Sequence, residues 1–170
     1  AYGATPVYNG ETPEKAADAQ YTYTFDKWTP AIGTVTGDAT YTATFSKTVN
    51  TYTVTWLNDN GDVLKTESVA YGDTPSYDGE TPTKGATAQY TYEFAGWVDA
   101  EGNPLAEDAV MGTEAVTYTA TYTATVNKYI VSFVVDGEVV SAEEYEYGAM
   151  PVAPEVADKE DADKVYTFVG

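Results

Sequence analysis

A long internal repeat is the feature that most constrains the fold of this chain. When the sequence is shifted by 69 positions, residues 2–28 align with residues 71–97, and 18 of these 27 positions are identical. Self-similarity at a fixed spacing is the sequence signature of repeat architectures. We therefore expect several copies of one small fold and not a single unrepeated domain.

The two copies differ in length after their shared tryptophan. Tyr41 follows Trp28 by 13 positions, whereas Tyr118 follows Trp97 by 21. The second copy thus carries eight extra residues, which we interpret as a loop insertion within residues 98–114. Beyond it the offset between the copies becomes 77, and the sequences match again.

A third copy begins near Lys128. The predicted organisation is therefore a partial repeat over residues 1–50, a complete repeat over 51–127 and a second partial repeat over 128–170. Because the first copy contains only the C-terminal part of a unit and the third only the N-terminal part, we expect the sequence to be a window from a longer array.

Within the complete copy the hydrophobic period is two, which is typical of β-strands. Residues 51–57 alternate Thr with apolar residues, Asn60-Gly61 suits a tight turn, and residues 63–69 return as a second strand. Residues 90–97 and 117–126 predict two more strands, in which Thr faces water and Tyr, Ala and Val face inward.

A short helix is expected between the two pairs of strands. Thr81-Pro82 has the composition of a helix N-cap followed by Pro at the first helical position. Residues 12–19 and 156–163 are the equivalent segments of the other copies. The predicted fold class is mainly β, with the order β-β-short α-β-β in each copy.

The composition excludes most catalytic chemistry. The chain has no His, Cys or Arg. It has 8 Lys and 27 Asp and Glu residues, which give a net charge of −19. It therefore lacks a near-neutral proton shuttle, a thiol nucleophile and a bidentate phosphate clamp. The negative charge also opposes binding to nucleic acid and anionic membranes. Paired carboxylates could still serve a hydrolase, but small repeated units offer no unique cleft, so we predict that the chain is not an enzyme.

Several motifs together resemble the Listeria–Bacteroides repeat of bacterial surface proteins, which is akin to internalin-type B repeats. They are Tyr-Thr-Val-Thr-Trp56, Tyr71-Gly-Asp-Thr-Pro75, Tyr-Glu-Phe-Ala-Gly-Trp97, Asp99-Ala-Glu-Gly102 and Val116-Thr-Tyr-Thr-Ala-Thr-Tyr122. The resemblance covers nearly the whole chain and implies a β-grasp-like α+β fold, tandem arrays in secreted or wall-attached proteins, and a role as stalk or adhesive module. The first copy departs from it at Asp26-Lys27 and in its shorter loop.

Three tryptophans are the candidate site residues. Trp28 and Trp97 are equivalent, and Phe133 matches Trp56 in the third copy. Exposed aromatic rings could bind glycan or contact a neighbouring repeat, but recurrence at one structural position favours a core role.

No cofactor is expected. Asn58, Asp59 and Asp62 around Gly61, and the acidic runs Glu143-Glu144-x-Glu146 and Glu160-Asp161-x-Asp163, leave structural calcium as an alternative. They lack the fixed ligand spacing and the closing Glu of an EF-hand, so turns and solvated acidic faces are the preferred interpretation.

The leading functional hypothesis is an extracellular structural repeat module, a stalk, spacer or filament of a bacterial surface protein. The alternative is an adhesin module that binds glycan or host protein through exposed aromatics and the 98–114 loop. Expected partners are neighbouring repeats of the same or another copy, including a hairpin at residues 129–145 that completes another chain's first copy by strand addition; nucleic acid and membrane insertion are not expected.

Overall fold

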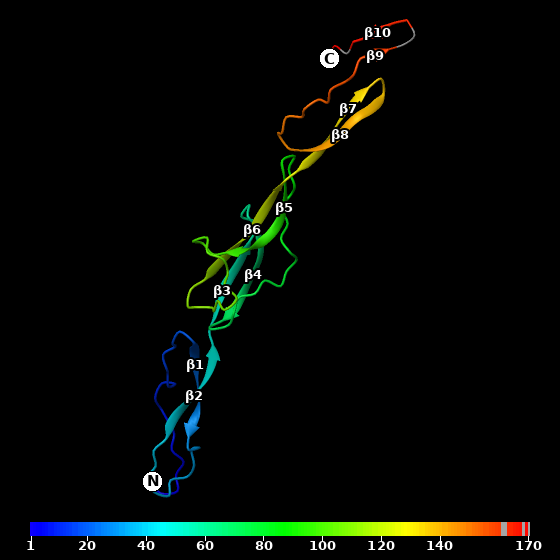
Figure 1. The fold of residues 1–170 in the computed structure, drawn as a ribbon. Helices are drawn as coiled ribbons and strands as arrows, with labels where there is room; N and C mark the ends of the chain where they lie inside the picture. Colours follow the sequence, from blue (N-terminus) through cyan, green and yellow to red (C-terminus); the bar gives the residue numbers. More distant parts are fainter. Residues whose placement is uncertain (161–162, 168, 170) are drawn as a thin grey trace. The chain divides into compact units, whose positions relative to one another are not determined.

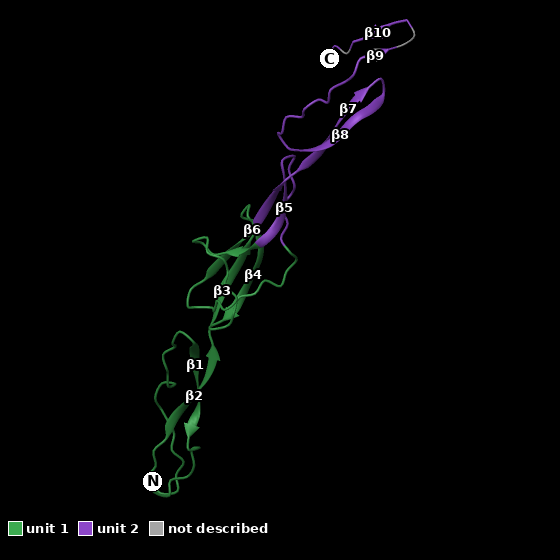
Figure 2. Ribbon diagram, viewed as in Figure 1, with its two compact units in different colours: residues 1–81, 96–121 green, residues 82–95, 122–170 purple. Residues whose placement is uncertain are grey.

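The computed structural model of the chain describes residues 1–160, 163–167 and 169. Its regular structure consists of β-strands, and no helix occurs among these residues. The chain divides into two compact units, formed by residues 1–81 with 96–121 and by residues 82–95 with 122–170 (Figure 2). This division does not follow the repeat boundaries, because strands β5 and β6 each contribute to both units.

The complete copy forms a mixed four-stranded sheet (Figure 1). Its strands, in the order in which they lie side by side, are β4 (Val63–Ala70), β3 (Thr51–Leu57), β6 (Val116–Val126) and β5 (Tyr90–Val98). The central pair, β3 and β6, is parallel and places Trp56 opposite Tyr118, whereas β3 and β4 pair antiparallel. The four strands predicted from the alternation are thus confirmed.

The flanking copies form smaller sheets. Strand β1 (Tyr21–Thr29) pairs antiparallel with β2 (Thr42–Val49), and β7 (Lys128–Val135) pairs antiparallel with β8 (Glu138–Glu146). A further short pair joins β9 (Lys159–Glu160) and β10 (Val165–Tyr166). Each of these is a two-stranded sheet, the smallest arrangement that pairs the backbone at all.

The hydrophobic core lies in the complete copy. Its fully or nearly fully buried side chains are Val54, Trp56, Met111, Tyr118 and Ala120. Inward-facing residues alternate with Thr along β3 and β6, as the period of two predicts. The inward pattern ends within β6, since Ala124 is exposed. The reason is that β3 pairs with β6 only through Thr119, so among the described residues no strand covers the second half of β6 on that side.

The expected short helices are absent from the residues that the structure describes. Residues 12–19 and 81–88 are irregular, and the described part of 156–163 contains strand β9 in place of a helix; residues 161 and 162 lie outside the described part. Isolated helices of fewer than about 12 residues are marginal in water unless an apolar face packs against the protein. Residues 14–20 are all exposed, and Gly85 further disfavours a helix in the complete copy.

Residues with positive φ occupy the turns of the β3–β4 and β7–β8 hairpins, of which the first was predicted at Asn60-Gly61. In the β3–β4 turn only Gly61 of the Asn60-Gly61 pair adopts a positive φ, of 88°. In the β7–β8 turn both Asp136 (φ 52°) and Gly137 (φ 89°) do so, the conformation of a tight two-residue hairpin loop.

Candidate functional site

Trp56 is the centre of an aromatic cluster in the complete copy. Its ring stacks on Tyr118 at a centroid distance of 5.0 Å and meets Trp97 edge-on at 4.8 Å and Tyr77 at 5.5 Å. Tyr77 and Trp97 also contact each other at 4.8 Å. Trp56 is 0 % exposed, so it offers no surface to a glycan. Trp97 is half-buried against it.

The carboxylate of Glu67 fixes the orientation of the Trp56 indole. The indole N–H donates a 2.8 Å hydrogen bond to the carboxylate of Glu67, which also receives a bond from Lys65. Lys65 in turn pairs with Asp78. The hydrogen bonds that Lys65 donates to Asp78 and then to Glu67 raise the pKa of Lys65, and the same bond to Asp78 lowers the pKa of Asp78.

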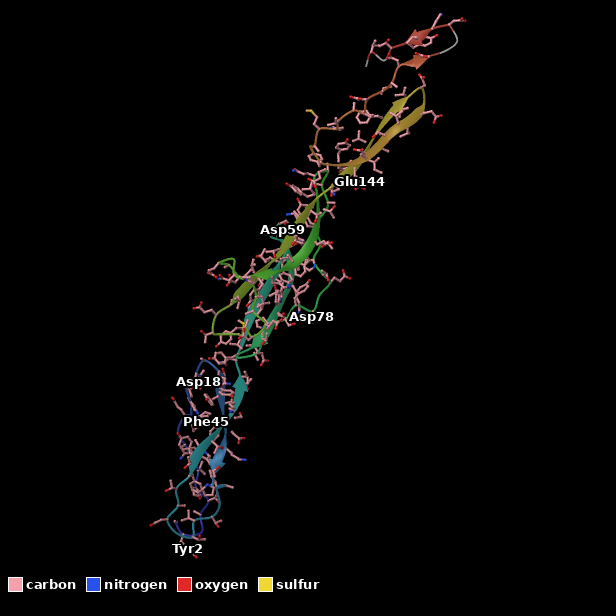
Figure 3. All side chains as sticks on the ribbon, in the orientation of Figure 1. Tyr2, Asp18, Phe45, Asp59, Asp78 and Glu144 are labelled. Atoms are coloured by element: carbon pink, nitrogen blue, oxygen red, sulfur yellow. The ribbon has the colours of Figure 1, made fainter. Side chains whose placement is uncertain are left out.

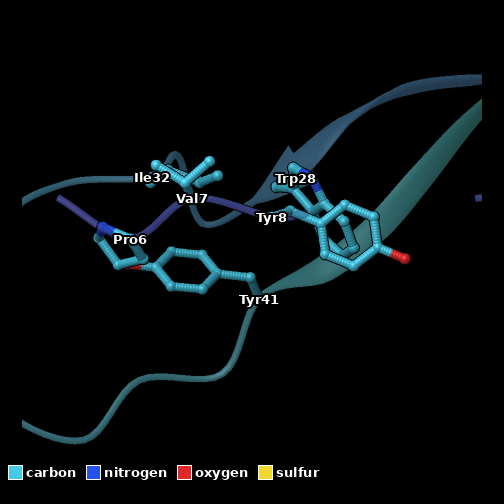
Figure 4. Close-up of a pocket in the computed structure, with 6 residues that line it drawn as sticks. All are labelled: Pro6, Val7, Tyr8, Trp28, Ile32 and Tyr41. Carbon is cyan, nitrogen blue, oxygen red and sulfur yellow. The ribbon is translucent and has the colours of Figure 1, made fainter. Parts of the chain in front are cut away.

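The first copy has an apolar pocket instead of a filled core. This pocket, called here the Trp28 pocket, has a volume of about 320 Å³. Its lining residues, drawn in Figure 4, are Pro6, Val7, Tyr8, Trp28, Ile32 and Tyr41.

The Trp28 pocket contains the counterparts of three of the four rings in the aromatic cluster. Tyr8 and Trp28 lie 4.9 Å apart with an interplanar angle of 56°, against 4.8 Å and 55° for their counterparts Tyr77 and Trp97. Tyr41 is the counterpart of Tyr118. In the complete copy these three rings surround Trp56, and the first copy contains no counterpart of Trp56. The pocket is therefore the position that a Trp56-like ring fills in a complete unit.

The inserted loop folds onto the core of the complete copy. Met111 is 1 % exposed, accepts a backbone hydrogen bond from Gly72 and donates one to Asp73. Half-buried Leu105 donates a backbone bond to Trp97 and packs on the same core. The insertion thus covers the Trp56 cluster, a role that the alignment of the copies did not predict because the first copy has no Met at all.

Asp99 lies at the start of this loop, and its side chain accepts the hydrogen bonds of a local turn. Its carboxylate accepts hydrogen bonds from the backbone N–H groups of Glu101 and Asn103 and from the Asn103 amide. The bonds from Asn103, side chain first, lower the pKa of Asp99. Burial raises the pKa of nearby Tyr118, and the Asp99 charge adds to that rise.

A single asparagine joins the first copy to the complete copy. Asn50 lies between the last residue of β2 and the first of β3, and all four of its polar groups are hydrogen-bonded. Its partners are the carbonyls of Asp18, Ala19 and Gln20, the hydroxyl of Thr22 and the backbone N–H of Tyr71. We call this arrangement the Asn50 junction.

The same arrangement recurs at Asn127, between β6 and β7. Its partners are the carbonyls of Thr87, Ala88 and Gln89, the hydroxyl of Thr91 and the backbone N–H of Tyr147. A tyrosine hydroxyl adds one bond at each junction, from Tyr52 to Ala19 at 2.9 Å and from Tyr129 to Ala88 at 2.6 Å. The sequence contains the matching pairs Val49-Asn50 and Val126-Asn127 at an offset of 77, but it does not reveal these hydrogen bonds.

The acidic residues in the described part of the chain form no metal site. Among the described residues, no group of three or more Asp and Glu is arranged to hold an ion, and Asp161 lies outside the described part. Asp18, Asp59 and Asp78 lie apart from one another (Figure 3). In the turn after β3, Asp62 instead bonds Asn60 through its carboxylate and its backbone N–H. The described residues also include no helix that is long and apolar enough to cross a membrane.

Comparison with protein families, with curated proteins and with solved structures found no match to this chain. The Trp28 pocket, the Trp56 cluster and the two Asn junctions are therefore the features from which a function must be argued.

Proposed function

We propose that the chain is a structural repeat module that acts as a stalk or spacer of a bacterial surface protein. The observation that supports this most directly is the pair of Asn junctions, in which one residue connects successive copies and every polar group of that residue is bonded. A net hydrogen bond contributes about 1 kcal/mol, so several bonds on one connecting residue resist bending there.

The distribution of charge and burial also supports a structural role. Tyr and Trp recur at matched positions and build the core, whereas acids vary between copies, as in Asp18 against Thr87 and Asp26 against Ala95. A distributed negative charge keeps such a module soluble and self-repelling. We further propose that the complete copy is a β-grasp-like unit whose connection between hairpins carries no helix, that the module is secreted, and that it acts without a cofactor or catalysis.

The adhesin alternative is less well supported. Trp56 is inaccessible, Trp97 is half-buried against it, and Met111 and Leu105 turn the inserted loop toward the core. Trp56, Trp97 and the inserted loop, which could bind glycan, are thus used to complete the fold of the complete copy.

Small-angle X-ray scattering of the chain, extrapolated to zero concentration, tests the spacer role. A compact globule of 170 residues has a radius of gyration of about 16 Å. A spacer requires a clearly larger value, and a measured value near 16 Å would overturn the proposal. The double variant Asn50→Ala/Asn127→Ala should broaden the distribution of interatomic distances, whereas Asn60→Ala, in a turn away from both junctions, should leave it unchanged.

A further inference from the structure

Strands β3 and β6 are the first and the last strand of the complete copy, and they also form the central pair of its sheet (Figure 1). The chain enters β3 directly after Asn50 and leaves β6 directly before Asn127. The two strands pair in parallel along Val54–Leu57 and Val116–Thr119. The chain therefore enters this pairing at one end and leaves it at the opposite end.

This topology determines how a pull along the chain loads the sheet. Tension applied at Asn50 and Asn127 draws β3 and β6 in opposite directions along their own axes. The backbone hydrogen bonds of a parallel pair run from strand to strand at even spacing, so such a pull strains all of them at once. In a hairpin, by contrast, a pull on the two free ends opens the bonds one after another. The centre of the complete copy is therefore loaded in shear.

The β3–β6 pairing also connects the two halves of the sheet. The strand order is β4-β3-β6-β5, so β4 and β5 lie at its edges. Among the described residues, β3 with β6 is thus the one strand pairing between the first two strands of the copy and the last two. A pull through the ends of the copy cannot separate these halves without breaking it.

A buried ring contact reinforces the pairing. Trp56 lies opposite Tyr118, with their ring centroids 5.0 Å apart, and the side chains are 0 % and 7 % exposed. The bond from the indole N–H to Glu67 of β4 holds the Trp56 ring to the first pair of strands. A slip of one residue, about 3.3 Å along a parallel strand, would bring Leu57 opposite Tyr118 and separate the stacked rings. Sliding therefore costs the ring contact as well as the backbone bonds.

We propose that the β3–β6 pairing is a mechanical clamp, a set of bonds strained together through which the complete copy carries tension without unfolding. The inference rests on the proposed spacer function for the source of the load, because tension reaches Asn50 and Asn127 when the array is held at both ends. The clamp itself is a property of the fold of the complete copy. Its signature is a resistance to force that depends on the direction of the pull.

Single-molecule pulling of the full chain in two directions tests the clamp. The chain has no native cysteine, so two engineered thiols define where the handles attach. Thr51→Cys with Thr125→Cys, both at exposed positions, loads the β3–β6 pairing in shear. Thr51→Cys with Ala115→Cys moves the second handle to the exposed residue before β6, so that the same pairing peels open from one end.

The two directions should give different unfolding forces at the same loading rate. We expect a several-fold higher mean force for the shear pair than for the peeling pair, because forced unfolding is governed by the unfolding rate along the direction pulled. Handles on β3 and β6 also leave the flanking copies unloaded. Equal forces in the two directions, or a lower force in shear, would overturn the proposal.

Two matched variants separate mechanical strength from ordinary stability. Val116 lies in the pairing and Leu105 in the inserted loop, and both are half-buried against the same core. Val116→Ala should lower the shear force. Leu105→Ala should leave it close to that of wild type, even where urea unfolding gives both variants a similar loss of stability. Shear forces that follow the urea stabilities, and not the place of the residue, would contradict the clamp.

Scattering and pulling test the spacer and the clamp separately. An extended chain whose unfolding force is the same in both directions would keep the spacer function and refute the clamp. A compact particle in scattering whose unfolding force is higher in shear would refute the spacer function and keep the clamp as a property of the complete copy.

Discussion

Trp56 and Tyr118 lie opposite each other across the parallel pairing of β3 and β6, and their rings stack at a centroid distance of 5.0 Å with an interplanar angle of 29°. Strand β3 belongs to the first pair of strands in the complete copy and β6 to the second. This contact therefore joins the two halves of the sheet and also forms part of the core. The first copy has the tyrosine of this pair, as Tyr41, but no strand that carries the partner ring.

Trp56→Ala is expected to destabilise the complete copy by about 3–5 kcal/mol, the usual cost of truncating a fully buried large aromatic residue. Trp56→Phe introduces the residue that the third copy has at this position and should cost less, mainly by leaving Glu67 without the indole donor. Trp28→Ala, beside an open pocket, should cost less than Trp56→Ala. Urea unfolding followed by near-ultraviolet circular dichroism measures all three, and equal losses for Trp28 and Trp56 would contradict the assignment of the core.

The two methionines provide a matched comparison for the inserted loop. Met111 is 1 % exposed and Met150 is 89 % exposed. Met111→Ala should lower the free energy of unfolding by about 2–5 kcal/mol, whereas Met150→Ala should stay within about 0.5 kcal/mol of wild type. A small effect at Met111 would show that the loop is not part of the core.

The strands were predictable from the sequence because one face of each is buried and the other is solvated, so Thr and apolar residues alternate. The short helices were predicted wrongly, because Thr81-Pro82 has the composition of a helix start although the residues after it have no apolar face to pack. Trp56 was predictable as a core residue from its recurrence as Phe133. Met111 was not, because a residue within an insertion has no counterpart to compare, and the Trp28 pocket is visible only when the missing strand is considered in three dimensions.

Acid should weaken the inserted loop through Asp99. Its folded-state pKa is held below the ordinary value of 3.8 by the bonds from Asn103. The stabilisation is therefore present above pH 3.8 and is lost as the pH falls through the lowered pKa. Asp99→Asn should reduce the steepness of this acid loss, measured as thermal stability from pH 6 to pH 2. Asp108→Asn, which removes a carboxylate from the same loop, is the control and should leave the slope nearer to that of wild type.

Asn127→Ala is expected to loosen the connection between β6 and β7 without unfolding the core of the complete copy. The substitution removes the amide bonds to the carbonyls of Thr87 and Ala88 and the acceptor for the Thr91 hydroxyl, and keeps both backbone bonds. At about 1 kcal/mol for each net hydrogen bond, and with water replacing the lost partners at an exposed site, the local cost should be about 1–2 kcal/mol.

Hydrogen exchange distinguishes this local effect from a global one. Protection should fall roughly ten-fold at the amides of Asn127 and Tyr147, because 1.4 kcal/mol corresponds to a factor of ten in an opening equilibrium, while Trp56 in β3 keeps its protection. Asn50→Ala should have the same effect at Asn50 and Tyr71, since the two junctions have the same bonds. A loss of protection that spreads through β3 would mean that the asparagines stabilise the fold of the unit, and unchanged exchange at the junctions would mean that they do not fix the connection between copies.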